Sequence, residues 1–308
     1  MRDHFIEQLS KLVCNDPRIM LITGDLGFGV FNDYRKKYAN NFINAGVAEQ
    51  NMTGLATGMA LEGKIVFTYS IANFSTLRCL EQIRNDACYH VANVNVVSIG
   101  SGFSYGALGI SHHATEDLSI MRSLPDITVV SPCGYWETME ATEAIVNIPG
   151  TCYLRLDKSA GDDKPQNDDE IFQIGKARKL REGSDCTIIV TGGILEEVLI
   201  AYEKLASEGI SARVLSMHTI KPIDNNAILK ASNETGAIIT VEEHTIYGGL
   251  GGAVAEILLD NNTIPKRFLR IGLEAGFSSI VGSQKYLRQR YKLDANSISS
   301  RVQSLLFE

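Results

Sequence analysis

The chain has 308 residues, of which 44% are hydrophobic, and its formal net charge is −7. A chain of this size buries an ample core, and its scattered charges of both signs give no reason to expect binding to nucleic acid or to an anionic membrane surface. The first residues do not read as a secretion signal and no apolar run approaches the roughly 20 residues that span a bilayer, so we expect no membrane segment and a cytoplasmic location.

Helical and strand patterns alternate through the first half of the chain. In order, we predict a helix over 5–13, strands over 19–23 and 42–43, a helix from about 49, a strand over 65–67, a long helix over 74–89, a strand over 94–97, a helix from about 115, a strand over 128–130, a helix over 135–146 and a strand over 151–154. This alternation is typical of parallel α/β architecture.

A polar, acidic segment at 159–175 that carries Gly and Pro interrupts the pattern and reads as a linker. The alternation then resumes with strands over 187–190, 212–216 and 237–241 and helices between and after them. We therefore predict two doubly wound α/β domains, over 1–158 and 176–308.

The six cysteines show no C-x-x-C spacing, which favours reduced structural thiols.

Glu49 stands at the start of a helical run that carries Gly54 and Gly58 on one face. Glycine inside a helix costs roughly 1 kcal/mol relative to alanine, so this face indicates the close approach of another backbone. An acid in the first turn is favoured by the helix dipole whatever its role. Position alone therefore leaves a capping acid and a functional acid both open.

The stretch Ala45-Gly-Val-Ala-Glu-Gln-Asn-Met52 resembles a segment of the pyrimidine-binding domain of transketolases and 1-deoxyxylulose 5-phosphate synthases. The resemblance implies that Glu49 is catalytic, because in that family the glutamate hydrogen-bonds and activates the aminopyrimidine ring of thiamine diphosphate. An acid that keeps a proton near neutral pH needs a dry place, since burial disfavours the charged form.

Two further segments extend the resemblance to the cofactor. Gly24-Asp-Leu26 is similar to the segment beside the thiazolium ring, which implies cofactor contacts for Asp25 and Leu26; an Asp after a strand is otherwise an ordinary turn residue. Phe74 falls where the family places an aromatic ring against the pyrimidine, a suitable stacking partner. The alternative for Phe74 is a core position on a buried helix.

Four residues are candidates for substrate binding. The segment from Gly109 to Leu118 resembles the family's histidine motif, which implies that His112 is catalytic at the donor carbonyl, with His113 beside it. Arg78 and Arg155 match arginines that meet an anionic substrate group, although structural ion pairs would look the same in sequence. No third ligand accompanies the histidine pair, so we predict no metal site in this chain.

The sequence departs from the family at two positions. Leu108 stands where transketolase has an Asp that contacts sugar hydroxyls, and Gly100 stands where it has a phosphate-binding His. These losses put the ordinary pentose phosphates in doubt. The sequence names neither the donor nor the acceptor sugar, nor whether they carry a phosphate or a nucleotide.

The Gly-Asp-Gly motif with which the family binds the magnesium diphosphate does not occur in the sequence. The resemblance therefore implies the C-terminal subunit of a split transketolase, transferring a two-carbon ketol unit between sugars or sugar phosphates. A partner N-terminal subunit would hold Mg²⁺ and the diphosphate of the shared thiamine diphosphate, most simply in an α2β2 heterotetramer.

Other functions stay open at this stage. Within the enzymes, these are a 1-deoxyxylulose-phosphate-synthase-like carboligase and a 2-oxo acid dehydrogenase β subunit. Outside them, the chain could be a non-catalytic assembly subunit. The run Gly102-Phe-Ser-Tyr-Gly106 also fits a nucleophile elbow, which would make Ser104, Asp224 and His244 a hydrolase triad. The glycines at 248–252 read as an interface element or, alternatively, a phosphate cradle.

Overall fold

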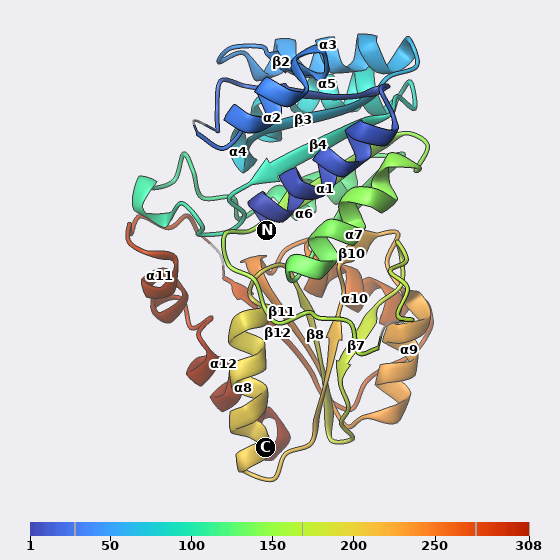
Figure 1. Ribbon diagram of the computed structural model, residues 1–308. Helices are drawn as coiled ribbons and strands as arrows, with labels where there is room; N and C mark the ends of the chain where they lie inside the picture. Colours follow the sequence, from blue (N-terminus) through green and yellow to red (C-terminus); the bar gives the residue numbers. More distant parts are fainter. Residues whose placement is uncertain (28, 168, 275, 308) are drawn as a thin grey trace.

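The computed structural model describes residues 1–27, 29–167, 169–274 and 276–307, so Asp168 of the predicted linker lies outside the described residues. It contains a seven-stranded sheet and a five-stranded sheet, each with helices on both sides (Figure 1). The prediction of two α/β halves with doubly wound sheets is confirmed. The exact boundaries at 158 and 175 stay a prediction.

The first half of the chain builds most of the seven-stranded sheet, in the order β10-β5-β6-β4-β3-β1-β2. Its elements are α1 (Arg2–Asn15), β1 (Ile19–Thr23), α2 (Asn32–Lys37), η1 (Ala39–Asn41), β2 (Phe42–Asn44), α3 (Glu49–Leu61), β3 (Ile65–Ile71), α4 (Ala72–Ser75), η2 (Leu77–Cys79), α5 (Leu80–Gln82), η3 (Ile83–Cys88), β4 (Val94–Ile99), η4 (Gly106–Leu108), α6 (Asp117–Ser123), β5 (Ile127–Val130), α7 (Tyr135–Val146) and β6 (Thr151–Leu156).

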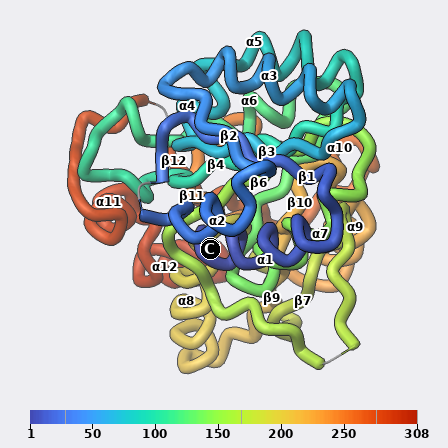
Figure 2. The backbone as a smooth tube through the Cα atoms, turned by 45° about the horizontal axis from the view of Figure 1, so that its top comes forward, coloured from blue at the N-terminus to red at the C-terminus, as the bar shows by residue number. Residues whose placement is uncertain are grey.

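Alternate residues of the central strands enter two different cores. In β1, Met20 and Ile22 join the cluster under α3, whereas Ile19 and Leu21 join the cluster under α1 and α7. Figure 2 shows α3 and α5 on one side of the strands and α1 and α7 on the other. A strand buried on both faces has no polar side to show, which explains the unbroken apolar runs in the sequence.

The long helix predicted over 74–89 is wrong as a single element. It is divided into α4, η2, α5 and a π-helical turn, with a break at Thr76, whose φ and ψ are −118° and −77°. The Thr76 hydroxyl donates to the carbonyl of Ala72 at 2.6 Å, so a side chain competes with the helical ladder at that point. Breaks of this kind commonly lie at functional sites.

The second half builds the five-stranded sheet, in the order β12-β11-β8-β9-β7. Its elements are β7 (Arg178–Arg181), β8 (Cys186–Thr191), α8 (Leu195–Ser207), β9 (Ala212–Ser216), β10 (Thr219–Lys221), α9 (Asn225–Glu234), β11 (Ile238–Thr245), α10 (Leu250–Asp260), β12 (Phe268–Leu273), α11 (Gln284–Arg290) and α12 (Ala295–Phe307).

The two halves share structure. Strand β10 lies in the second half of the sequence yet pairs antiparallel with β5 at the edge of the first sheet. One apolar cluster runs from Val129 in the first sheet to Leu215 in the second sheet and Met217 just after it. Within the predicted linker, Asp163 is buried and accepts hydrogen bonds from the backbone N–H groups of Trp136 and Glu137.

No helix in the described part of the chain combines the length and apolar character that a bilayer crossing requires.

Candidate active site

The residues predicted to meet the cofactor follow the carboxyl ends of four adjacent strands. The order β4-β3-β1-β2 places Asp25 after β1, Glu49 after β2, Phe74 after β3 and the loop with His112 after β4. From β1 the chain continues to β2 on one side and then to β3 on the other side. Open α/β sheets bind ligands at such a switch point. We call this region the strand-end edge.

Glu49 is the first residue of α3, and its side chain is 2% exposed. Its Oε2 lies 3.0 Å from Nη1 of Arg78. A Cβ on Gly24 would lie 3.4 Å from the Cγ of Glu49, so the turn after β1 passes directly over the carboxyl group. A helix N-terminus favours an acid here, and the chain covers that acid on the side of β1.

Arg78 joins Glu49 to an aromatic group. Its guanidinium carbon lies 3.9 Å from the centre of the Phe74 ring, and its side chain is 45% exposed. The Phe74 ring in turn meets the ring of His112 edge to face, with 5.1 Å between centroids. The structure thus brings four of the predicted residues into one continuous group.

His112 lies in the loop after β4, and Ser111 Oγ is 2.9 Å from its Nδ1. The pKa of His112 lies below its ordinary value. The main cause is partial burial, and the neighbouring His113 and Arg78 lower it further. The imidazole is therefore neutral at pH 7 and can accept a proton. The ring of Tyr105 also lies near His112, with 6.2 Å between the centroids.

His113 points elsewhere. It is buried, its Nε2 lies 3.1 Å from the carbonyl oxygen of Gly106, and its ring meets Phe103 edge to face. Its contacts hold the loop together from inside, and the structure does not bring it to Phe74. Its predicted role in substrate binding stays a prediction that this placement does not support.

Asp25 lies in the turn after β1 with a φ of 57°, a left-handed conformation that is uncommon for a residue with a side chain. Its Oδ1 accepts a hydrogen bond from Nδ2 of Asn44 at 2.8 Å. Leu26 follows it, half-buried. Both lie beside Gly24, which covers Glu49, so the predicted cofactor segment and the predicted activating acid are neighbours.

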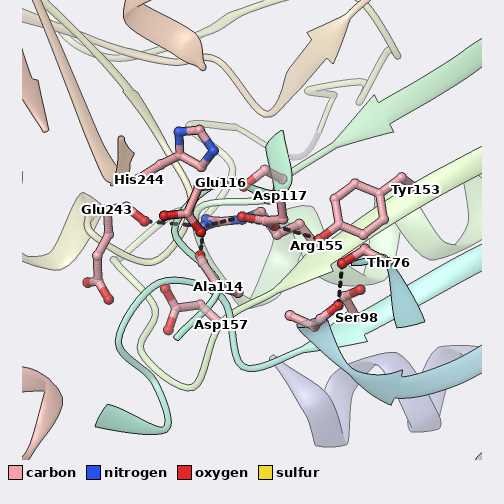
Figure 3. A network of polar contacts seen from close by, with 12 residues as sticks. Thr76, Ser98, Ala114, Glu116, Asp117, Tyr153, Arg155, Asp157, Glu243 and His244 are labelled. Carbon is pink, nitrogen blue, oxygen red and sulfur yellow. Dashed lines mark hydrogen bonds and ion pairs between the residues drawn. The ribbon is translucent and has the colours of Figure 1, made fainter. Parts of the chain in front are cut away.

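Arg155 belongs to another network of polar contacts, with Asp117, Ala114 and Glu243 (Figure 3). It is buried, its Nε donates to Oδ2 of Asp117 at 2.7 Å, and one Nη donates to the carbonyl oxygens of Ala114 and Glu243. Burial acts to raise the pKa of Asp117, but the charges of Arg155 and His244 and the hydrogen bonds from Arg155 and Tyr153 together outweigh it and hold the pKa below its ordinary value. The guanidinium is engaged by the chain itself.

The hydrolase triad considered from the sequence is wrong. Ser104 Oγ donates to Oδ1 of Asp157 at 2.6 Å. Asp224 caps α9 through the N–H of Ala227, and the Nδ1 of His244 lies 2.7 Å from the carbonyl oxygen of Thr245. The three side chains belong to three separate sets of contacts.

The glycines that open α10 are equally occupied. Glu242 accepts hydrogen bonds from the N–H groups of Leu250 and Gly251 at 2.7 and 2.8 Å, so a carboxylate of this chain fills the place that a phosphate would take. Within the ranges described, no group of three or more His, Cys, Asp or Glu side chains is arranged to hold a metal ion.

A cavity of about 290 Å³ adds residues that the sequence patterns did not indicate. Arg2 and Lys158 line it, but so do Asp3 and Asp157, and Lys158 Nζ lies 3.7 Å from the centre of the Tyr105 ring. Burial and the charge of Arg2 lower the pKa of Lys158. Tyr105 also approaches His112, so this cavity, lined by charges of both signs, adjoins the strand-end edge. A signal was available, because Lys158 comes shortly after the strand predicted over 151–154.

Comparison with known families gives a match along both halves. Residues 1–163 match the transketolase pyrimidine-binding domain, and residues 175–298 match the transketolase C-terminal domain. Together with the sheet switch point and its glutamate, these define the class: a transferase that uses thiamine diphosphate.

Individual relatives agree with this class. The chain is 38% identical over 298 residues to a subunit of the apulose-4-phosphate transketolase from Phocaeicola vulgatus, covering 96% of this chain and 94% of that one. It is 37% identical to a 6-deoxy-6-sulfo-D-fructose transketolase subunit from a Clostridium species, covering 97% and 92%. A structure described as a split gene transketolase, inactive β4 tetramer, superposes with a TM-score of 0.88 at 34% identity, covering 99% and 97%. The chain belongs to the transketolase family.

Proposed function

We propose that this chain is the subunit of a split transketolase that supplies the pyrimidine half of the active site, and that the assembled enzyme transfers a two-carbon ketol unit between sugars. The proposal is carried by one observation: Glu49, Phe74 and His112, from three different strand ends, lie together at the switch point of the first sheet. Relatives named as transketolase subunits match nearly the whole chain.

The residues present fit the pyrimidine of thiamine diphosphate. Glu49 offers a buried carboxyl group for a ring nitrogen, Phe74 offers a flat face for stacking, and Asp25 and Leu26 border the same place. When bound, the cofactor supplies the carbon nucleophile and the electron sink that ketol transfer requires. The chain's own part is to bind and orient the ring and to exchange a proton with it at the Glu49 carboxyl group.

Arg78 stands between Glu49 and Phe74, in the place proposed for the ring. Its planar guanidinium lies over the aromatic face and donates toward the carboxyl group, two contacts that an aminopyrimidine would make. Binding of the ring therefore requires Arg78 to turn outward, which its half-exposed side chain permits. From there it is available to the substrate.

His112 is proposed as the proton acceptor for a substrate hydroxyl. Its lowered pKa keeps the imidazole neutral at pH 7, which is the form that takes a proton. Lys158, in the cavity beside Tyr105, is proposed to meet an anionic end of the sugar. The phosphate and the sulfonate in the names of the two relatives above support an anionic substrate, although they do not identify the sugar.

A partner subunit is proposed to bring the diphosphate and its Mg²⁺. The outer face of α3 supports this proposal, because Leu55 and Leu61 are exposed on the helix and Val47 is exposed just before it. A Cβ added at Gly54 or Gly58 would meet no atom within 4 Å. The cost of two helical glycines, roughly 1 kcal/mol each, is then not offset by packing within this chain. An α2β2 assembly and a cytoplasmic location are the simplest form of the proposal.

The decisive variant is Glu49→Gln, made in the complex with the partner subunit. We expect turnover to fall by about 10²- to 10⁴-fold, the loss typical of a missing proton-transfer group. Glu62→Gln, at the exposed end of the same helix, is the matched control and keeps wild-type turnover. Full activity of Glu49→Gln would remove the basis of the proposal.

Release of carbon dioxide from pyruvate would instead indicate one of the decarboxylating alternatives.

A further inference from the structure

The loop that carries His112 is held by the second half of the chain. It leaves β4 at residue 100 and returns at Ala114, where Gly102 and Ala114 exchange two backbone hydrogen bonds of 2.8 and 3.0 Å. Glu243 of β11 reaches the inside of this loop, and its Oε1 accepts a hydrogen bond from the N–H of Phe103 at 2.5 Å. The base of the loop thus rests on a carboxylate from the other sheet.

Glu243 is itself fixed on several sides. It is 1% exposed, it forms an ion pair with Arg288 of α11, and Gln284 Nε2 lies 3.0 Å from its Oε1. The same Gln284 nitrogen lies 3.1 Å from Oδ1 of Asp157, which Ser104 of the loop also contacts. One connected set of polar groups therefore joins α11 to the loop.

Packing reinforces these hydrogen bonds. Gly102 has a φ of +55°, and a Cβ there would collide with Oε1 of Glu243, so the loop backbone sits directly on the carboxylate. At the loop's other side, the N–H of Gly282 donates to the carbonyl of Gly106 at 3.2 Å. Figure 1 shows α11 beside this loop.

We propose that Glu243, held by Arg288 and Gln284, is a positioning residue that fixes the His112 loop against the strand-end edge. This proposal rests on the function proposed above. Glu243 belongs to β11 of the second sheet and contacts the base of the loop, so it acts on the reaction only through the loop. The second domain then has a part in catalysis in addition to any part in assembly.

The neighbouring residue offers a matched control. Glu242 is as buried as Glu243 and also accepts two hydrogen bonds, but these come from the backbone N–H groups at the start of α10, and its nearest charged neighbour is His244 at 3.5 Å. Glu243→Gln and Glu242→Gln therefore both remove one buried charge from the same strand. Only Glu243→Gln loosens the contact with the loop.

Two measurements separate this proposal from the proposed function. In the full chain without its partner, diethyl pyrocarbonate labels exposed neutral histidines, and mass spectrometry reports the rate at His112. We expect Glu243→Gln to raise this rate severalfold and Glu242→Gln to leave it unchanged. In the assembled enzyme we expect Glu243→Gln to lower kcat by about 10- to 100-fold, the effect of a displaced catalytic group, with cofactor affinity unchanged.

Gln284→Leu provides a second, milder variant that keeps the Glu243–Arg288 ion pair, for the case in which Glu243→Gln does not fold. It should change both readouts in the same direction by a smaller factor. Equal labelling of His112 in the wild type and in these variants would overturn the positioning role even if the wild-type complex is an active transketolase. Altered labelling without any transketolase activity would overturn the proposed function alone.

Discussion

Two ionic groups of this molecule differ in how completely the chain surrounds them. At the junction between the sheets, Arg155 and Asp117 are fully buried, and the hydrogen bonds of the guanidinium go to oxygens of this chain. At the strand-end edge, Glu49 is buried but its partner Arg78 is half exposed and rests on an aromatic face. The first arrangement is complete, and the second leaves room for another molecule.

The difference teaches how to separate structural from functional charges. A buried charge must be paired and hydrogen-bonded, because desolvation is costly. Where the chain supplies all of the partners, the group stabilises the fold. Where one partner is exposed, a ligand can replace it and take over its contact with the buried charge. Sequence patterns showed both arginines as equal candidates, and only the surroundings distinguish them.

Replacing each arginine by methionine gives the largest test of this comparison. Arg155→Met leaves the carboxylate of Asp117 buried without its cation, and we expect a loss of about 3–5 kcal/mol in the free energy of unfolding. Arg78→Met should cost less than about 1 kcal/mol, because the Arg78 side of the pair is open to solvent. Urea denaturation of both variants measures the contrast, and similar losses would contradict it.

The comparison also predicts how stability depends on pH, through the buried carboxylate of Asp163. Burial, with the nearby Glu137, raises the pKa of Asp163 from 3.8 to about 6. The folded state therefore binds a proton that the unfolded state has already released, so stability present below about pH 4 is lost as pH rises through about 6. The loss is about 3 kcal/mol.

Asp163→Asn removes this titration. We expect its stability relative to the wild type to increase between pH 4 and pH 6.5, as measured by denaturation at the two pH values. Asp162→Asn, at the exposed neighbouring position, is the control and should follow the wild type. A constant difference between Asp163→Asn and wild type across this range would show that Asp163 titrates normally.

The smallest effect concerns Arg78 and the cofactor. Removing its guanidinium frees both Phe74 and Glu49, so we expect Arg78→Met to bind thiamine diphosphate about fivefold more tightly in the assembled enzyme, equivalent to roughly 1 kcal/mol. Calorimetric titration with the cofactor and Mg²⁺ measures this. Arg84→Met, an exposed arginine in the following turn, is the control. Weaker cofactor binding by Arg78→Met would contradict this expectation and indicate that Arg78 contacts the bound cofactor.

Much of the fold followed from the sequence because it depends on local patterns. The apolar strands and the helix that begins at Glu49 were predicted from periodicity, and the family motifs pointed to Phe74 and His112. The break at Thr76 was missed, since a hydroxyl that bonds back to the preceding turn leaves the apolar spacing unchanged. The pairing of Arg155 with Asp117 was also missed, because 38 residues separate the two and no local pattern records such a contact.

Strand β10 has a consequence for anyone who divides this protein. Because Thr219–Lys221 completes the outer border of the first sheet, a fragment that stops in the 159–175 segment would expose the backbone of β5. Unpaired sheet edges of this kind form hydrogen bonds with strands of other molecules. Domain swaps between related enzymes should therefore carry this three-residue strand along with the first half, since the functional unit of exchange does not coincide with the order of the sequence.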